Sequence, residues 1–476
     1  MIQETPAGET IAPEDTPPDG GYGWVCVACV FWNNAHHWGI TSAYAVFLSY
    51  FTTNKTFQNA SSLDYAFIGG LSVSQALLIS PIASTITRKF NINVTILLGV
   101  IFETAALLGA SFSHKIWQLY LSQGICFGWG IGFQYVSTIG IIPQWFSKRR
   151  SLASGIAASG SGVGGLIYTL STNALISRFG VAWTYRTLAV IQFSVNVICA
   201  ILLRDRNARV RAKIIAIDPK LFKLYHYWLF LGWAALSVMG FMVLLLSLDD
   251  YSRSIGLSSQ QGSDVAALLN LGQAFGRPLV GHFSDVIGRM NMAAFATLLT
   301  SFLCLLLWVF AKSFGLLIFF SLSAGAVFGT FWTVVGPLGA EVVSLQDLPS
   351  CLTVMWLVCS IPAAFGEPIG LVLRKKGVNT YLDPQLFTGF MYFGAAIFML
   401  LLRTWKISAI KSIELPGAVV TDRPEDRGVS GAQTGVKTPK HAIKLLGIGG
   451  SGARWKRVVA AIASPSCCHR SINFDS

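Results

Sequence analysis

Apolar stretches of about 20 residues recur along almost the whole chain, and short polar segments separate them. Each stretch is close to the length that an α-helix needs to cross a bilayer. The pattern predicts about twelve membrane-spanning helices, and thus an all-α membrane protein. The predicted spans are residues 25–50, 65–86, 94–111, 116–143, 152–176, 183–203, 227–248, 265–283, 292–310, 314–338, 351–373 and 387–402.

Composition supports this fold class. Hydrophobic residues make up 53% of the 476 residues and charged residues only 12%, whereas about a quarter of a soluble domain is charged. So few charges could not cover the surface of a water-soluble fold. We therefore expect an integral multi-pass membrane protein that is embedded in the lipid bilayer.

Basic residues gather in three segments that each follow an even number of predicted spans. All three segments therefore lie on the same side of the membrane. These clusters lie at 88–89, 148–150 and 204–223, and lysine and arginine are enriched on the cytoplasmic side. Twelve spans then place both termini in the cytoplasm, and the plasma membrane is the expected location. One cluster, at 374–376, disagrees because it follows the eleventh span. The net charge of +13 is an orientation signal, so nucleic acid is not an expected partner.

Two groups of six spans are joined by a polar stretch. This predicts two six-helix bundles, at 24–203 and 227–403, with a cytoplasmic loop at 204–226. Residues 1–23 are acidic and rich in proline, and residues 404–476 carry scattered charges, glycine and serine, so both are expected to be disordered cytoplasmic tails. Paired repeats are typical of secondary transporters, whose solute site lies between the repeats.

Arg277 lies inside the apolar stretch 265–283, where a charge costs about 2.5 to 3.5 kcal/mol near a helix centre. Such a residue usually faces a wet cavity, where it can bind a carboxylate through two charge-assisted hydrogen bonds. Gln273 precedes it by one helical turn and shares its face. In the first span, Asn33, His37 and Thr41 are also one turn apart, which predicts a polar stripe along the same cavity.

Four ionisable side chains within the spans are candidates for proton coupling: His36, His37, Glu103 and Glu367. Histidine ordinarily titrates near neutral pH. The alternative is that these groups are neutral and form hydrogen bonds between helices. The sequence leaves both interpretations open.

The segment after the eighth span reads Gly281-His-Phe-Ser-Asp285-Val-Ile-Gly288-Arg289. It resembles the Gly-x-x-x-Asp-x-x-Gly-Arg loop signature of the major facilitator superfamily, which implies that family's fold of two six-helix bundles. Glycine permits close helix approach, and the aspartate can pair with basic groups on a neighbouring helix in one conformation only. The predicted gating residues are Gly281, Asp285, Gly288, Arg289, Arg149 and Arg150. Alternatively, Asp285 and Arg289 only end the helix and follow the charge rule.

A second motif points to one branch of the superfamily. The segment Asp19-Gly20-Gly21-Tyr22-Gly23-Trp24 leads into the first span and resembles the Asp-Gly-Gly-x-Gly-Trp motif of the monocarboxylate transporter family, above all of its fungal members. The pair Arg277-Pro278 resembles the arginine–proline pair in that family's eighth helix. The resemblance covers residues 18–403, and it implies alternating-access transport of a small or medium organic anion.

The chain departs from that family at two positions. Proton-coupled animal members have a lysine in the first helix and an aspartate one turn before the arginine, where this chain has Ser42 and Gln273. The resemblance therefore implies anion binding by Arg277, but it does not carry over the family's proton route. Ser42, Gln273, Asn33 and His37 are expected to shape the pocket, and symport, efflux and facilitation stay open.

Two alternatives to this function remain. The chain could export an acidic or neutral metabolite, or it could be a non-transporting receptor built on a transporter fold. An enzyme is not expected, because no Ser/His/Asp, His-Glu-x-x-His or paired-aspartate arrangement occurs at catalytic spacing. No cofactor or metal is expected either. Asn54 and Asn59 begin sequons that predict glycosylation in an outer loop.

Overall fold

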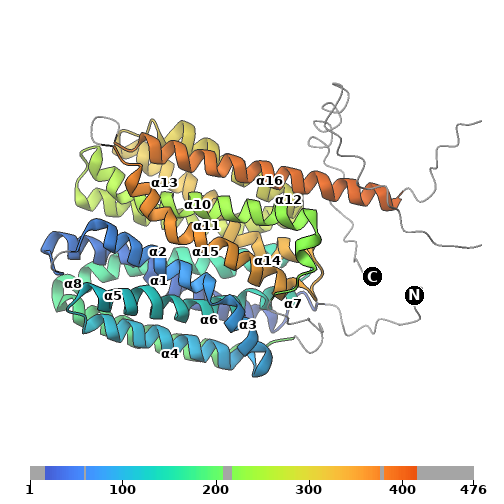
Figure 1. The fold of residues 1–476 in the computed structure, drawn as a ribbon, viewed down its shortest axis with the longest axis horizontal. Coiled ribbons are helices and arrows are strands. Elements are labelled where there is room, and N and C mark those ends of the chain that lie inside the picture. Colours follow the sequence, from blue (N-terminus) through green and yellow to red (C-terminus); the bar gives the residue numbers. More distant parts are fainter. Residues whose placement is uncertain (1–16, 58–59, 207–216, 376–379, 415–476) are drawn as a thin grey trace, which may run out of the picture. The chain divides into compact units, whose positions relative to one another are not determined.

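A computed structural model describes residues 17–57, 60–206, 217–375 and 380–414, and every regular element in these ranges is a helix. The long helices lie side by side along a common direction (Figure 1). The described residues up to Leu402 form one compact unit, and the described residues from Arg403 onward belong to a second unit. The predicted all-α membrane fold is confirmed.

The helices follow the order of the predicted spans. The first half of the chain forms α1 (Gly23–Asn54), α2 (Ser62–Leu78), α3 (Ser80–Lys89), α4 (Ile92–Ser111), α5 (Ile116–Leu119), the π-helix η2 (Tyr120–Cys126), α6 (Phe127–Ile139), α7 (Ile141–Trp145) and α8 (Arg150–Leu202). The short 3₁₀ helix η3 (Leu221–Lys223) precedes the second half. That half forms α10 (Tyr225–Ser254), α11 (Ser259–Ile287), α12 (Arg289–Phe302), the π-helix η4 (Leu303–Trp308), α13 (Phe314–Phe328), α14 (Thr330–Val342), α15 (Leu348–Val372) and α16 (Leu382–Glu414).

Nine helical stretches among the described residues are long and apolar enough to cross a membrane. One of them, the 53-residue α8, contains two crossings, because Gly180 interrupts it with φ 76° and ψ 169°. The helices α1 and α11, with 32 and 29 residues, are also long enough but have polar residues in their middle. Together these helices account for the twelve predicted spans. The two helices that are less apolar carry the candidate site residues around Asn33 and Arg277.

The two halves of the chain meet through two pairs of helices. α8 packs along α11 and α2 packs along α15, while α8 also packs along α1 and α4 within the first half. Such close contacts require small residues. At Gly164 of α8, an added Cβ would lie 2.0 Å from the backbone oxygen of Ala35 in α1, so only glycine fits. Through α8, the first half is thus in contact with α11, the helix that contains Arg277 and Asp285.

Three predicted spans differ from the helices that form. The last span was expected to end at residue 402, but α16 continues to Glu414, because no glycine or proline occurs between Leu402 and Pro416. The span at 65–86 is divided into α2 and α3 at Ile79, just before Pro81. The span at 314–338 is divided into α13 and α14 at Gly329.

Candidate functional site

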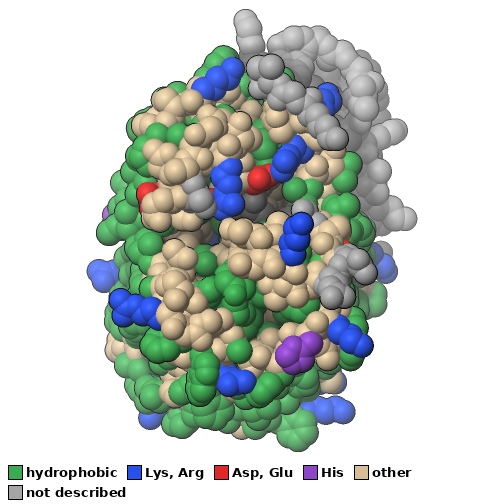
Figure 2. Space-filling view, turned by 90° about the vertical axis from the view of Figure 1, so that its left-hand side faces the viewer, with side chains coloured by type: hydrophobic (Ala, Val, Ile, Leu, Met, Phe, Trp, Pro, Cys, Tyr) green, Lys and Arg blue, Asp and Glu red, His purple; other side chains and the backbone are tan. Residues whose placement is uncertain are grey.

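A cavity of about 310 Å³ lies between the two halves of the chain. Its wall runs from Thr52 in the last turn of α1 and Arg253 in the last turn of α10 inward to Arg277 in α11 and Pro337 in α14. We call the open end the mouth, and the opposite end of the helices, which holds Asp285, the latch end. Figure 2 looks onto the mouth, where acidic and basic side chains gather around a hollow.

Arg277 lies in the wall of the cavity with 5% of its surface exposed. Its Nη1 donates to the backbone oxygen of Ala158 at 2.9 Å and to Ser161 Oγ at 2.5 Å, and its Nη2 donates to Gln273 Oε1 at 2.5 Å. Its Nε is buried without a hydrogen-bond partner. All three acceptors are neutral, and none of the ion pairs among the described residues includes Arg277. The wall therefore contains a positive charge without a counter-ion.

A polar row on α11 extends from Arg277 towards the mouth. Gln273 Nε2 donates to Asn270 Oδ1 at 3.1 Å, and both residues line the cavity. Asn270 was not predicted, although its spacing of seven residues from Arg277 places it on the same helical face. Gly329 leaves room for the guanidinium, because an added Cβ would lie 3.0 Å from Arg277 Nε.

The polar residues of α1 line the cavity only in part as predicted. The residues of α1 that line the cavity include Asn34, Trp38, Thr41 and Ser42. Asn33 and His37 are instead fully buried and do not border it. The rotation of α1 is set by its contact with Gly164 of α8, and the local sequence cannot reveal that contact, because polar residues occur on both faces of α1. The prediction that Asn33 and His37 line the cavity is therefore corrected for this conformation.

Asn33 belongs to a buried row of hydrogen bonds that ends at Glu103. Asn33 Nδ2 donates to Gln134 Oε1 at 2.7 Å, and Gln134 Nε2 donates to Glu103 Oε2 at 2.6 Å. Glu103 is fully buried, and its Oε1 has no partner. Neither ring nitrogen of His37 has a hydrogen-bond partner. The row joins α1, α4 and α6 beside the cavity.

The remaining predicted proton-coupling and glycosylation residues either do not line the cavity or have side chains that the structure does not describe. His36 shares a hydrogen bond of 2.5 Å with the hydroxyl of Tyr168, between α1 and α8. Glu367 belongs to α15, but its side chain is not among those that the structure describes. Asn54 is exposed as the last residue of α1, at the mouth end, and Asn59 lies outside the described residues.

Four aromatic side chains from both halves, which we call the aromatic wall, line the cavity. Trp38 of α1 and Tyr135 of α6 come from the first half, and Phe241 of α10 and Trp332 of α14 come from the second. The ring centroids of Trp38 and Trp332 are 5.3 Å apart, and those of Tyr135 and Phe241 lie 5.9 and 5.7 Å from that of Trp332. These separations are typical of favourable contacts between aromatic rings.

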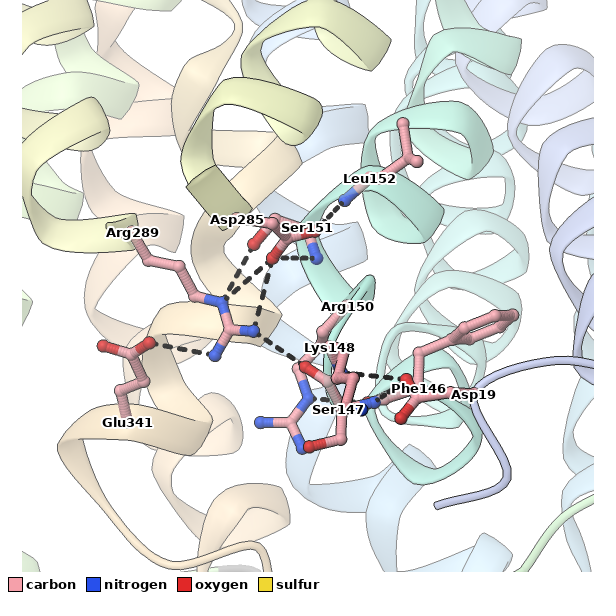
Figure 3. Close-up of polar contacts among 10 residues, drawn as sticks. All are labelled: Asp19, Phe146, Ser147, Lys148, Arg150, Ser151, Leu152, Asp285, Arg289 and Glu341. Atoms are coloured by element: carbon pink, nitrogen blue, oxygen red, sulfur yellow. Dashed lines mark hydrogen bonds and ion pairs between the residues drawn. The ribbon is translucent and has the colours of Figure 1, made fainter. Parts of the chain in front are cut away.

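At the latch end, Asp285 near the end of α11 caps the start of α8. Its carboxylate oxygens accept hydrogen bonds from the backbone N–H groups of Ser151 and Leu152, at 3.0 and 2.8 Å (Figure 3). The first turn of a helix favours an anion because its N–H groups are unpaired and the helix dipole is positive there. Gly281 permits this approach, since an added Cβ would lie 2.3 Å from the backbone oxygen of Ser151.

Arg289, the first residue of α12, connects α8, the loop before it and α14. Its Nε donates to Ser151 Oγ at 3.0 Å, its Nη1 to Glu341 Oε1 at 2.9 Å and its Nη2 to the backbone oxygen of Ser147 at 3.0 Å (Figure 3). It also pairs with Asp285 at 3.3 Å. We call Asp285, Arg289 and these partners the latch. Glu341 was not predicted, because only the fold brings it to Arg289.

The other predicted gating residues lie at the starts of α8 and α12, and their role in gating stays a prediction. Gly288 has φ 106°, which turns the chain from α11 into α12. Arg150 is buried, and its Nε donates to the backbone oxygen of Phe146 at 2.9 Å, whereas Arg149 is exposed. Asp285 was expected to pair with basic side chains on a neighbouring helix. The principal donors from α8 are backbone N–H groups instead, because the start of that helix provides them.

The Asp-Gly-Gly motif binds the loop that precedes α8. Asp19 Oδ1 accepts hydrogen bonds from the N–H groups of Ser147 and Lys148 at 2.7 and 2.8 Å (Figure 3). Asp19 and Gly21 have φ values of 53° and 59°, so the chain turns tightly just before α1. Trp24 then packs edge-on against Phe146, with ring centroids 5.0 Å apart. The motif and the latch thus hold the same loop, at Ser147.

Ion pairs surround the mouth. The pairs are Arg253–Asp249 at 2.6 Å, Lys375–Asp383 at 2.6 Å, and Arg374–Asp250. The hydroxyl of Tyr381 also donates to Asp250. Arg374 and Lys375 belong to the basic cluster that disagrees with the charge rule, and their acidic partners give the cluster a structural role at the mouth.

Comparisons with known proteins agree with this architecture. Residues 24–243 match the family model described as Major Facilitator Superfamily. The chain is 35% identical over 398 residues to the probable transporter MCH2 of Saccharomyces cerevisiae, and the match covers 82% of this chain and 84% of that protein. It is 34% identical to the uncharacterized transporter ESBP6 of the same yeast, over 83% of this chain and 60% of that protein. It is 28% identical to the fujikurins efflux protein of Gibberella fujikuroi, over 82% of this chain and 84% of that protein.

Proposed function

This chain belongs to the major facilitator superfamily and is a multi-pass membrane transporter, and on that premise we propose that it moves a small or medium organic anion by alternating access. The observation that carries the proposal is the guanidinium of Arg277, which borders the cavity and has only neutral hydrogen-bond acceptors. A carboxylate would supply the missing negative charge and an acceptor for Nε. Gln273 and Ser161 orient the guanidinium for this contact.

The mouth and the latch support the proposed mechanism. The cavity is open at the mouth while Asp285 holds the start of α8, so the two halves are joined at the opposite end. Exposure of Arg277 at the latch end requires Asp285 to leave those N–H groups. The latch end and both termini lie in the cytoplasm, and the transporter resides in the plasma membrane.

Glu103 is the proposed site of proton coupling. Ser42 and Gln273 replace the ionisable groups of the related proton-coupled transporters, and Glu103 Oε1 has no hydrogen-bond partner. The row through Gln134 and Asn33 links Glu103 to α1, which also borders the cavity. His36 and His37 serve as packing groups between helices.

The decisive experiment measures uptake and efflux of a panel of carboxylates in proteoliposomes at two pH values. The substitution Arg277→Gln removes the positive charge that would bind the carboxylate. It is expected to lower uptake about 10- to 100-fold, because a charge-assisted hydrogen bond contributes about 1.5 to 3 kcal/mol. Arg178→Gln is the matched control, since it removes the same charge at an exposed position of α8. The wild type and both variants are compared at equal protein density in the vesicles. Carboxylate uptake that Arg277→Gln leaves unchanged would contradict the proposal.

A second candidate function is export of an acidic or neutral metabolite through the same cavity. It is supported by the relative whose name describes an efflux protein. Direction is decided by loading the proteoliposomes with the solute and measuring its release. A receptor would bind solute without net flux in either direction.

A further inference from the structure

The aromatic wall and Arg277 border one cavity, and they are close to each other. Trp332 lies three residues after Gly329, where an added Cβ would be 3.0 Å from Arg277 Nε, and both Trp332 and Arg277 line the cavity. The wall continues from Tyr135 to Trp38 and Trp332, at centroid separations of 5.5 and 5.9 Å. A solute bound to Arg277 therefore has aromatic surface beside it.

We infer that the transported anion carries a flat aromatic ring, which packs on the aromatic wall while its acidic group pairs with Arg277. This inference rests on the proposed function, and it names the class of solute. The ligand class is an aromatic monocarboxylate or a larger aromatic acid.

The shape of the wall supports a ring more than an aliphatic chain. The rings of Trp38 and Tyr135 meet edge to face at 87°, and those of Tyr135 and Trp332 at 69°. Neighbouring rings that line the cavity thus lie in different planes, and a further aromatic ring can pack against them in an edge-to-face or an offset-stacked arrangement. A saturated ring of the same size gains only apolar contact.

The size of the cavity also favours a solute larger than a two- or three-carbon acid. A volume of about 310 Å³ falls within the range of about 300 to 1,000 Å³ that is usual for sites of drug-sized ligands. The lining also contains apolar surface, to which the aromatic wall contributes four rings. A small acid would leave most of that surface without contact.

The test compares benzoate with cyclohexanecarboxylate, which has the same charge and nearly the same size but no aromatic ring. In proteoliposomes, wild-type kcat/KM is expected to be about 3- to 10-fold higher for benzoate, as contacts between aromatic rings imply. Trp332→Leu is expected to abolish this preference, and Trp332→Phe to retain part of it. Trp117→Leu, at an exposed position outside the cavity, is the matched control.

The outcomes separate this inference from the proposed function. Equal kcat/KM for the two ring acids in the wild type overturns the aromatic inference but leaves anion transport intact. Absence of uptake for every carboxylate overturns both. A preference for benzoate that survives in Trp332→Leu, with normal amounts of protein in the membrane, also overturns the role of the wall.

Discussion

Three neutral acceptors hold the guanidinium of Arg277 in one orientation without cancelling its charge. Two of them, the Ala158 carbonyl and Ser161 Oγ, belong to α8, and the third is Gln273 Oε1 on the same helix as Arg277. A fixed orientation reduces the entropy that solute binding has to overcome. The space around the guanidinium should therefore affect solute affinity.

Gly329→Ala tests that space. The new Cβ would lie 3.0 Å from Nε and 3.1 Å from Nη2 of Arg277, so the guanidinium has to move. We expect KM for the anion to rise about tenfold, the equivalent of about 1.4 kcal/mol, with little change in the amount of protein. Gly315→Ala is the control, because nothing lies within 4 Å of a Cβ at that position. Equal KM values for the two variants would contradict this role of Gly329.

Glu103→Gln tests the proposed proton site. Glutamine resembles the protonated carboxyl in shape and cannot titrate, so a transporter that couples through Glu103 should lose the pH dependence of uptake. The measurement is initial uptake at a series of pH values on both sides of neutrality, in wild type and variant, with an imposed proton gradient. A pH response that is the same in both would exclude Glu103 as the coupled site.

Among elements, the contact of α11 with the first turn of α8 joins the two halves of the chain at the latch end. Asp285 accepts two backbone hydrogen bonds there, and Arg289 adds contacts to α8, to the loop before it and to α14. The contact between α3 and α15, which also joins the two halves, differs in its chemistry. Ser84 Oγ and Thr353 Oγ1 share a hydrogen bond of 2.9 Å between α3 and α15, so neutral hydroxyl groups meet where the other pair has charges.

Asp285→Ala should therefore favour opening at the latch end. Each lost hydrogen bond to a charged group is worth about 1.5 to 3 kcal/mol, which corresponds to a shift of at least about tenfold in the equilibrium. In a Ser49→Cys background, labelling by a membrane-impermeant thiol reagent at the mouth should become slower. Asp264→Ala, at the other end of α11, is the control. Faster labelling in Asp285→Ala would contradict the latch.

The helices and the Arg277 region could be predicted from the sequence, but several contacts could not. Apolar runs predict all twelve spans, since span length is a local property. Which residues of α1 line the cavity was predicted correctly for Thr41 and Ser42 but not for Asn33 and His37, because a contact with Gly164 on another helix orients α1. The donors to Asp285 leave no signal in the sequence, because every residue except proline has a backbone N–H group.

At the scale of the whole molecule, the cavity and the latch define two different ends of the transporter. Substitution of Ser49 or Thr52 by cysteine would place a thiol in the wall of the mouth, and Ser147→Cys would place one at the latch end. In intact cells we expect an impermeant thiol reagent to label the first two variants and not the third. The unsubstituted chain controls for its own cysteines. Labelling of Ser147→Cys alone would reverse the proposed orientation.

The first crossing of α8 contains both the acceptors for Arg277 and the donors for Asp285. About seven to ten residues separate Ser151 from Ala158 and Ser161, which is about 10 to 15 Å of helix. A solute that draws the guanidinium away from α8 removes contacts from the same helix pair that the latch holds together. Thermodynamic reciprocity then requires that release of the latch alter solute affinity by the same factor. We therefore expect the empty carrier to change its orientation rarely, so that it exchanges solute across the membrane while leaking little.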